Sequence, residues 1–301
     1  MRNTNVIVIG AGPAGLSAGL WCSDLGLRTV VLERAYEPGG QLLSVYNQIK
    51  NYPGYYAANG VELRDLIREQ VDRSEATLLL SVNIASSDLA NRSLTLDDGS
   101  ELAADHIIIA TGVRRRMLNV PGEGSLADRG ILTSGVRDRA DVKGRNVVIV
   151  GGGDAALENA LMLSEVAAKV TIVHRRDTFA ARDEFVSAAR ARKNVDIVLN
   201  SNVSRILGED FLTGIEINGS GDARTIACDN LLIRIGVEPN SEPFRGQIEV
   251  DTDGYIVVDR DCRTSLPDVF AAGDAASPLS PTIATAVGMG ATAAKVIASQ
   301  K

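Results

Sequence analysis

The 301-residue sequence lacks paired cysteines, long apolar runs and an excess of positive charge. Its three cysteines, Cys22, Cys228 and Cys262, are far apart and odd in number, so no disulfide framework is expected and a reducing compartment is favoured. No run of about 18 apolar residues occurs, which argues against a membrane-spanning helix. The net charge of −7 gives no overall positive field for nucleic acid or anionic lipid. We therefore expect a cytoplasmic protein that binds neither nucleic acid nor membranes.

Aromatic residues are also scarce, at 4% of the chain, whereas glycine is abundant with 29 residues. An ordered glycine costs backbone entropy, so clusters of glycine need a geometric reason. Several such clusters follow directly after apolar segments, and they are the first places to look for a binding site.

The first cluster belongs to a complete dinucleotide-binding unit. Residues 6–9 form a continuous apolar run, typical of a parallel strand that is buried on both faces. The motif Gly10-Ala11-Gly12-Pro13-Ala14-Gly15 follows at once, and residues 16–25 have helical spacing. A second strand, residues 29–32, ends at Glu33. This order of strand, glycine turn, helix, strand and acid predicts a βαβ unit that binds a dinucleotide.

Each glycine of this motif has a separate expected role. Gly10 permits the tight turn, Gly12 lets a pyrophosphate approach the backbone, and Gly15 allows close packing of helix and strand. The phosphates would then lie at the helix N-terminus, beside Pro13 and Ala14. Glu33 is placed to accept hydrogen bonds from ribose hydroxyls.

The same unit recurs in the second half of the chain. An apolar strand at residues 146–150 precedes Gly151-Gly152-Gly153-Asp154-Ala155-Ala156, a helix at residues 157–165 and a strand at residues 169–173. That strand ends at His174, which lies 23 residues after Gly151, as Glu33 lies 23 residues after Gly10. A single glycine motif is weak evidence, but two complete units with the same offset strongly predict two dinucleotide sites.

The two units differ at the end of their second strand. Glu33 would repel a 2′-phosphate, so the first unit suits FAD or NAD. The second unit offers His174, Arg175 and Arg176, with Arg182 further on, and arginine guanidinium groups match phosphate oxygens. This end therefore favours NADPH over NADH, although Arg175 and Arg176 also suit a solvated loop.

Three further segments fit a flavin site. Pro38-Gly39-Gly40-Gln41-Leu42 would let backbone run against a flat ring, with Gln41 free to hydrogen-bond. A strand at residues 106–110 closes in Ala110-Thr111-Gly112, which allows close approach to a cofactor, and Arg114, Arg115 and Arg116 follow as a solvated hinge face or a contact for an acidic protein. Near the C-terminus, Gly273-Asp274 ends a short strand, and Asp274 is placed to hold ribityl hydroxyls. A helix at residues 281–298 follows, with its N-terminus available to negative charge.

These motifs, in this order, resemble the low-molecular-weight thioredoxin reductase family of flavoproteins over nearly the whole chain. The resemblance also includes Asn51-Tyr52-Pro53-Gly54 and His174-Arg175-Arg176-Asp177. It implies an α/β fold with two Rossmann-like, doubly wound, three-layer domains. The FAD domain would comprise residues 1–112 and 237–301, and the NADPH domain, residues 113–236, would be inserted into it. It also implies a homodimer, and contacts to FAD from Arg34, Asn51, Thr282 and Ile283 and to NADPH from Gly153, Asp154 and Ala155.

One departure from the family concerns the electron acceptor. Family thioredoxin reductases carry a Cys-x-x-Cys pair shortly before the second glycine motif, and here those positions are Ser134 and Arg137. Flavin-to-disulfide transfer needs two thiols within bonding reach, which this chain does not supply in sequence. A second departure is Ala180, where the family has an arginine, so Arg182 would have to replace it.

The sequence therefore predicts an FAD-dependent NAD(P)H oxidoreductase with no catalytic side chain and no metal site. Relatives without the cysteine pair include ferredoxin–NADP reductases, so ferredoxin or flavodoxin is the first expected acceptor. A small quinone, a free flavin or a small disulfide remains open. The alternatives are a disulfide reductase with an unrecognised thiol pair such as Cys228 with Cys262, a non-catalytic redox sensor, and an oxidase that consumes oxygen.

Overall fold

The computed structural model describes residues 2–219 and 223–300, and its chain forms two compact units. Unit 1 comprises Met1–Arg114 and Glu238–Lys301, and unit 2 comprises Arg115–Val237. The chain therefore leaves unit 1 once and returns once. The two connecting strands, β7 (Val113–Arg115) and β16 (Val237–Pro239), pair with each other.

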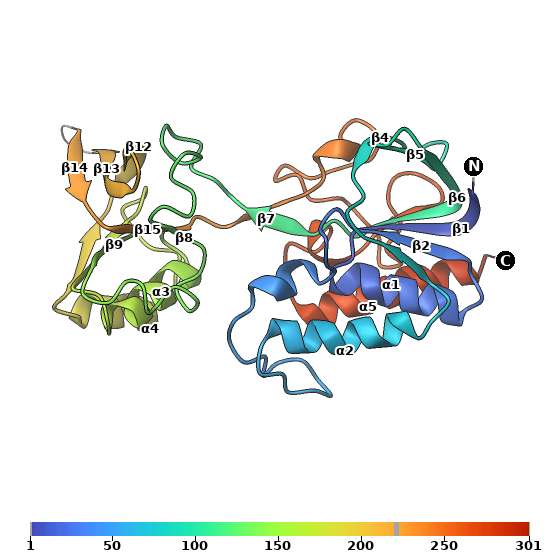
Figure 1. Cartoon of the computed structure of the whole chain (residues 1–301), viewed down its shortest axis with the longest axis horizontal. Coiled ribbons are helices and arrows are strands. Elements are labelled where there is room, and N and C mark those ends of the chain that lie inside the picture. The colour runs from blue at the N-terminus through green and yellow to red at the C-terminus, as the bar shows by residue number, and fades with distance from the viewer. Residues whose placement is uncertain (1, 220–222, 301) are drawn as a thin grey trace. The chain divides into compact units, whose positions relative to one another are not determined.

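Unit 1 is built on a seven-stranded mixed sheet (Figure 1). Its strands run in the order β3-β2-β1-β6-β5-β4, with β17 paired to β6. Strands β1, β2, β3, β6 and β17 are parallel, and the β4–β5 hairpin is antiparallel. The strands are β1 (Arg2–Ile9), β2 (Thr29–Leu32), β3 (Thr77–Leu79), β4 (Ile84–Asp88), β5 (Ser93–Leu96), β6 (Glu101–Ile109) and β17 (Val269–Ala271). The helices are α1 (Pro13–Asp24), α2 (Gly60–Asp72) and α5 (Ile283–Ala298), with short 3-10 turns η1 (Gly40–Ser44), η2 (Glu242–Phe244) and η3 (Gly273–Ala275).

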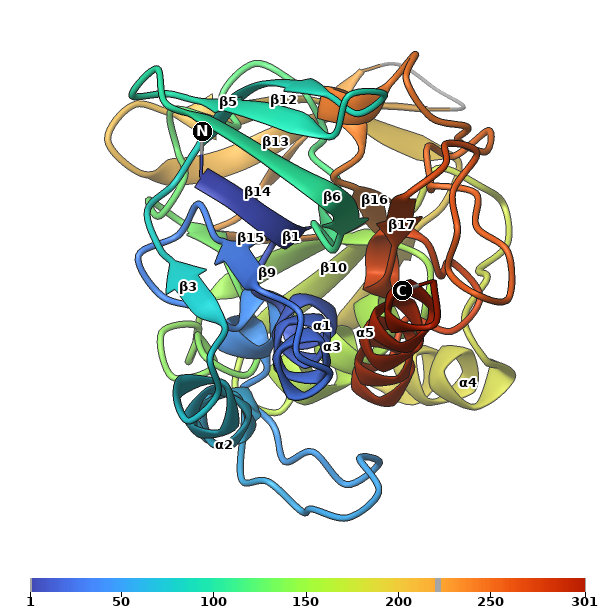
Figure 2. The same ribbon diagram turned by 90° about the vertical axis from the view of Figure 1, so that its right-hand side faces the viewer.

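Both faces of this sheet are buried, which explains the unbroken apolar run of β1. Val6 and Val8 pack against the helical layer of α1, α2 and α5, and Figure 2 shows these three helices on one side of the strands. Ile7 and Ile9 point to the opposite face, where they pack with residues of β5 and of the loops after η2. Alternating side chains of one strand therefore supply two separate cores.

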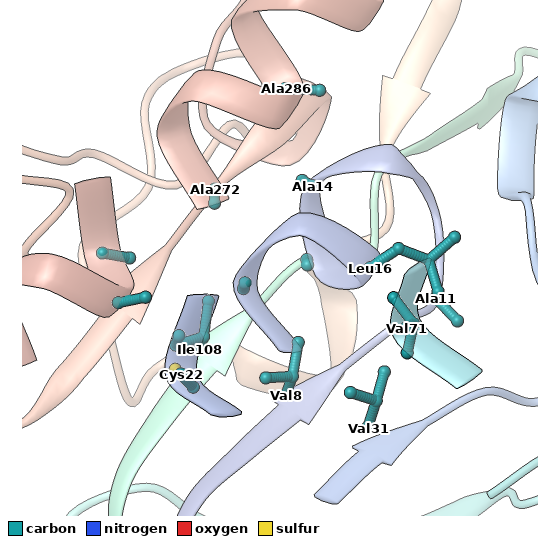
Figure 3. Close-up of a cluster of buried hydrophobic side chains, with 14 of the residues drawn as sticks. Val8, Ala11, Ala14, Leu16, Cys22, Val31, Val71, Ile108, Ala272 and Ala286 are labelled. Atoms are coloured by element: carbon teal, nitrogen blue, oxygen red, sulfur yellow. The ribbon is translucent and has the colours of Figure 1, made fainter. Parts of the chain in front are cut away.

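Small residues let α1 and α5 approach closely. A Cβ atom at Gly290 of α5 would lie 2.2 Å from the carbonyl oxygen of Ala14 in α1. Ala286 and Ala293 continue this contact along α5, and Ala14, Ala272 and Ala286 belong to the core drawn in Figure 3. The small-residue pattern that predicted a helix here thus serves to pack it against the glycine-turn helix.

Unit 2 has a parallel five-stranded sheet in the order β11-β10-β9-β15-β8. Its strands are β8 (Ile131–Leu132), β9 (Asn146–Gly151), β10 (Lys169–Val173), β11 (Val195–Val198) and β15 (Asn230–Arg234). Val147 and Ile149 pack with α3 (Asp154–Ser164) and α4 (Asp183–Ala191). Val148 and Val150 pack with a three-stranded antiparallel sheet, β12 (Ser201–Gly208), β13 (Leu212–Gly219) and β14 (Arg224–Ala227).

The strand registers bring the functional segments of each unit to one sheet edge. In unit 1, Ile9 is level with Leu32 and Ile109, and Ile109 is level with Ala271. The residues after these four strands therefore meet at the carboxyl edge, where open α/β sheets bind ligands. In the described part of the chain, no helix is long and apolar enough to cross a membrane.

Candidate dinucleotide-binding sites

The glycine turn of unit 1 adopts the geometry that its sequence predicts. Gly10 has a φ of +103°, and a Cβ atom there would lie 2.4 Å from the carbonyl oxygen of Ala110. A Cβ atom at Gly15 would lie 1.8 Å from the carbonyl oxygen of Gly10. Helix α1 then begins at Pro13, and no side chain caps its N-terminus at Gly12. Its first N–H groups are available to an anion.

Glu33 holds this turn together through its carboxylate. One oxygen accepts a hydrogen bond of 2.8 Å from the backbone N–H of Ala11, and the other accepts one of 2.9 Å from Ala35. Each oxygen keeps a second lone pair for an outside donor. The acid at the end of β2 therefore orders the turn and still presents acceptors to a ligand.

A cavity of about 400 Å³ opens at this edge, entirely within unit 1. It brings together most of the residues predicted for FAD: Gly10, Gly12, Pro13, Ala14, Glu33, Arg34, Gly40, Gln41, Leu42, Ala110, Thr111, Gly112, Gly273, Asp274, Thr282 and Ile283. It is also lined by residues that the sequence did not single out: Ala35, Glu37, Leu43, Val45, Val113, Asn240, Ala272, Pro281 and Ala286. Gly15 and Asn51 are not among the lining residues; Gly15 is buried in α1, and Asn51 is exposed in a loop.

Gln41 is less free than its sequence context predicts. Its side-chain amide donates a hydrogen bond of 2.8 Å to the carbonyl oxygen of Val113, at the start of β7. Its amide oxygen and its second N–H remain available to a ligand. The hydrogen bond forms because Gln41, in η1, lies close to Val113 at the start of the connecting strand β7.

Asn240 is the most informative of the residues that sequence reasoning missed. Its backbone N–H donates to the Gly112 carbonyl, and its side-chain amide donates to the Thr111 carbonyl at 2.8 Å. The Thr111 hydroxyl donates in return to the Asn240 carbonyl at 2.8 Å. This reciprocal pairing fixes the Thr111–Gly112 backbone at the cavity wall. No local motif marks Asn240, because its partners lie far away in sequence.

Asp274 carries the clearest sign that the cavity is built for a polar ligand. Burial raises the pKa of its carboxyl above the usual range. Within residues 2–219 and 223–300, no protein group donates a hydrogen bond to it. A half-buried acceptor without a donor is costly unless a ligand supplies hydroxyl or N–H groups. The cavity residues therefore fit a large dinucleotide that carries several hydroxyls.

Replacing Asp274 with asparagine is expected to separate stability from binding. The raised pKa means that the folded apoprotein binds the Asp274 proton more tightly than the unfolded chain does. This tighter proton binding contributes favourably to the stability of the fold below the usual carboxyl pKa. The contribution is lost as the pH rises through the raised pKa of Asp274. At pH 7 we expect Asp274→Asn apoprotein to be more stable by less than about 1 kcal/mol, yet to bind FAD about tenfold more weakly.

Thermal unfolding of both apoproteins between pH 3 and pH 8, with FAD titrations, checks this prediction. The stability advantage of the variant should shrink toward the acid end. An unchanged FAD affinity would contradict a binding role for Asp274.

The glycine turn of unit 2 has the same construction. Gly151 has a φ of +152°, and a Cβ atom there would lie 2.1 Å from the Arg234 carbonyl oxygen. A Cβ atom at Gly152 would lie 2.2 Å from the ring of His174. The His174 ring also stacks on Phe179 and forms a 3.1 Å hydrogen bond with the Thr178 carbonyl. Burial lowers the pKa of His174, so this neutral ring supports the turn by packing.

The three arginines that follow β10 differ in their surroundings. Arg175 and Arg176 are exposed. Arg182 is also exposed, and it forms ion pairs of 2.8 Å with Asp154, 3.5 Å with Glu158 and 2.8 Å with Glu184. Its backbone N–H also bonds to Asp154, and this bond and the Arg182 charge lower the pKa of the Asp154 carboxyl. Arg182 therefore offsets negative charge at the N-terminus of α3, where the nucleotide phosphates are expected.

Replacing Arg182 with alanine tests this charge balance. Without Arg182, the carboxylates of Asp154 and Glu158 in α3 lose their positive neighbour, so the KM for NADPH and for NADH should rise by about two- to fivefold. Stability should change little, because these ion pairs are exposed. Steady-state kinetics with both nucleotides measure the effect. Adding Asp154→Asn should restore the KM. A rise confined to NADPH would instead mean that Arg182 contacts the 2′-phosphate directly.

The positions where the family has its cysteine pair form a tight polar loop. Ser134 is buried, and its backbone N–H donates to the Asp138 carboxylate at 2.9 Å. Thr133 donates to the same oxygen at 2.8 Å, and Arg137 forms an ion pair with Asp138. The loop therefore contains no sulfur, and one carboxylate organises its backbone.

The three cysteines are buried and unpaired. Burial raises the pKa of Cys22 and of Cys228 to about 12, and that of Cys262 to about 11. All three remain protonated at neutral pH, and a protonated buried thiol is a poor nucleophile. In the described ranges, no three His, Cys, Asp or Glu side chains gather as metal ligands.

Comparisons with known proteins agree with this architecture. The family model for pyridine nucleotide-disulphide oxidoreductases matches residues 4–290. A thioredoxin reductase of Streptomyces clavuligerus is 37% identical over 296 residues, covering 96% of this chain and 91% of that protein. One from Listeria monocytogenes is 36% identical over 293 residues, with the same coverage of 96% and 91%.

Solved structures agree as well. Lactococcus lactis thioredoxin reductase, in its FR conformation, superposes with a TM-score of 0.83 at 31% identity, covering 98% of this chain and 97% of that one. The T. acidophilum thioredoxin reductase gives 0.82 at 29%, with 100% and 99% covered. These matches confirm the predicted fold and the predicted cofactors, FAD and NADPH, which this family uses. The chain belongs to the pyridine nucleotide-disulphide oxidoreductase family and is an NAD(P)H-dependent FAD oxidoreductase of the thioredoxin reductase type.

Proposed function

We propose that this chain passes electrons from NADPH to an external acceptor without a redox disulfide of its own. The observation that carries the proposal is the loop of Ser134 and Arg137, which holds a buried carboxylate network in place of two thiols. The cysteines elsewhere are buried in apolar cores, with Cys22 and Cys262 in unit 1 and Cys228 in unit 2. An internal dithiol relay has no residues to use.

The cavity of unit 1 is the proposed FAD site. Gly10, Gly12 and the N-terminus of α1 would receive the pyrophosphate, and Glu33 would accept from ribose hydroxyls. Asp274 would accept from the ribityl chain, and Thr111 and Gly112 would line the ring. FAD, when bound, supplies the two-electron exchange with the nicotinamide, while these residues supply position and electrostatics. The N-terminus of α5, at Thr282 and Ile283, directs its positive end to the same cavity.

The carboxyl edge of unit 2 is the proposed NADPH site. Gly151, Gly153 and the N-terminus of α3, at Asp154 and Ala155, would receive the pyrophosphate. Arg175 and Arg176 are exposed and would bind the 2′-phosphate, while His174 holds the turn in place.

The relatives named above favour a disulfide as the acceptor. Both sequence relatives and both solved structures are thioredoxin reductases, whereas ferredoxin or flavodoxin, the first expectation from the sequence, has no support among them. The net reaction would oxidise NADPH and reduce one S–S bond to two thiols, with uptake of one proton. The disulfide would belong to the substrate alone. We also propose a homodimer, as the family resemblance implies.

Replacing each cysteine with alanine tests the absence of a relay. Cys22→Ala, Cys228→Ala and Cys262→Ala should each keep kcat within about twofold, measured with NADPH and dithiobis(nitrobenzoate). Each should lose only about 1–2 kcal/mol of stability, because a small buried group is removed. A variant that retains FAD but loses more than tenfold in kcat would identify a working thiol and overturn the proposal.

A further inference from the structure

Arg64 is a charged residue among the buried residues of α2. Its side chain is only 11% exposed, whereas the other buried side chains of the helix, Leu63, Ile67 and Val71, are apolar and belong to the core. Burying a guanidinium group is costly unless carboxylate and carbonyl oxygens accept its hydrogen bonds. The position of Arg64 therefore needs a reason other than packing of the core.

The guanidinium group joins α2 to the segment that follows β2. Its Nη1 donates a hydrogen bond of 2.8 Å to a carboxylate oxygen of Glu37 and one of 2.9 Å to the Pro38 carbonyl. Its Nε donates one of 2.6 Å to Asp65, an exposed neighbour on α2. Asp65 thus orients the planar guanidinium group, and Nη1 holds both the Glu37 carboxylate and the backbone beside it.

The aliphatic part of Arg64 packs against the next residue of the same segment. Gly39 has a φ of +127°, and a Cβ atom there would lie 2.7 Å from the Cγ of Arg64. The Gly39 N–H donates a hydrogen bond of 2.8 Å to the Ala11 carbonyl, and a Cβ atom at Gly40 would lie 3.1 Å from the Cα of Gly12. The segment that Arg64 holds therefore lies directly against the glycine turn of β1 and α1.

Glu37 brings a carboxylate from this segment to the wall of the unit 1 cavity. The hydrogen bond from Arg64 is the largest cause of the lowered pKa of the Glu37 carboxyl. Glu37 is therefore ionised at neutral pH, and its carboxylate keeps lone pairs for a ligand. FAD offers ribose hydroxyls and an adenine amino group as donors to such an acceptor. A side chain that is already held in place loses less rotamer freedom on binding, so it binds more tightly.

We propose that Arg64 is a positioning residue of the FAD site and acts through Glu37. Arg64 is not among the residues that line the cavity. It holds the Glu37 carboxylate and the backbone of residues 38–40 in a binding conformation before the cofactor arrives. The inference rests on the proposed location of FAD in the cavity of unit 1.

Replacing Arg64 with methionine keeps an unbranched apolar stem and removes the guanidinium group. We expect the Kd for FAD to rise about tenfold in Arg64→Met. The rate at which NADPH reduces the flavin should stay within about twofold at saturating FAD, because Arg64 does not reach the reacting atoms. Arg64→Lys, which restores a cation, should limit the rise in Kd to about threefold.

Arg68 provides the matched control. It lies one turn further along α2 and pairs with Asp72 at 3.1 Å, and both side chains are partly exposed. Arg68→Met removes an ion pair from the same helix by the same substitution, so it should leave the Kd for FAD within about twofold of the wild-type value.

A double-mutant cycle shows whether Arg64 works through Glu37. Glu37→Ala alone should raise the Kd for FAD about tenfold, and adding Arg64→Met should raise it little further. If the two effects multiply to a rise on the order of a hundredfold, the residues act independently and the inference is wrong. Should Arg64→Met not fold, the same cycle with Arg64→Lys gives the answer, because its smaller rise should also vanish in the Glu37→Ala background.

Gly12→Ala separates failure of this inference from failure of the proposed FAD site. If Gly12→Ala weakens FAD binding and Arg64→Met does not, the site stands and the positioning role is refuted. If neither variant changes the Kd, FAD binds elsewhere and both proposals fail. A lower Tm of Arg64→Met with an unchanged Kd would make Arg64 a residue of the fold alone, which would also overturn the inference.

Discussion

Replacing Gly10 with alanine is expected to destabilise unit 1 by about 3–5 kcal/mol and to yield protein without FAD. The residue has a φ of +103°, which an L side chain rarely adopts, and its Cβ atom would lie 2.4 Å from the Ala110 carbonyl oxygen. Relief of this clash requires β6 to move away from the turn. Urea unfolding and the flavin absorbance of the purified variant measure the two effects.

Two other glycines serve as controls for this effect. Gly26 has a φ of +71° with nothing within 4 Å of a Cβ atom, so Gly26→Ala should cost only about 1 kcal/mol and keep FAD. A Cβ atom at Gly12 would meet only the Gly40 Cα, at 4.0 Å, so Gly12→Ala should fold normally. Because Gly12 lines the cavity, the same variant should still bind FAD more weakly. Normal FAD content in Gly10→Ala would contradict the assigned geometry.

Replacing Asp138 with alanine should destabilise unit 2 by about 3–5 kcal/mol. The Asp138 carboxylate is almost fully buried, accepts two backbone N–H groups and pairs with Arg137. Its loss leaves those donors unsatisfied and removes a negative charge that attracts Arg234. The free energy of unfolding in urea measures the change.

An exposed aspartate of the same unit provides the comparison. Asp196 pairs with Lys169 at 2.6 Å, and both side chains are about half exposed. Asp196→Ala should therefore change stability by less than about 1 kcal/mol. Equal effects of the two substitutions would show that the loop at residues 133–138 is not organised by its carboxylate.

The sequence was most informative where a local pattern carries the geometry. Both glycine turns, the strands at residues 29–32 and 169–173, and the acid at Glu33 are visible because strand, turn and helix are adjacent in the chain. Parallel strands with buried faces then bring Gly10, Ala110 and Gly273 to one edge.

The sequence was least informative where contacts join distant segments. The pairing of Asn240 with Thr111 and the bond from Gln41 to Val113 depend on how the chain returns to unit 1. The ion pairs of Arg182 with Asp154 and Glu158 likewise require the folded unit. Asn51 matched a family motif, yet it does not line the cavity.

An anaerobic titration of the FAD-loaded protein with NADPH tests the central claim most directly. A chain without an internal dithiol should accept two electrons per FAD, all of them visible as loss of flavin absorbance. Uptake of four electrons per FAD would reveal a redox-active thiol pair and contradict the account.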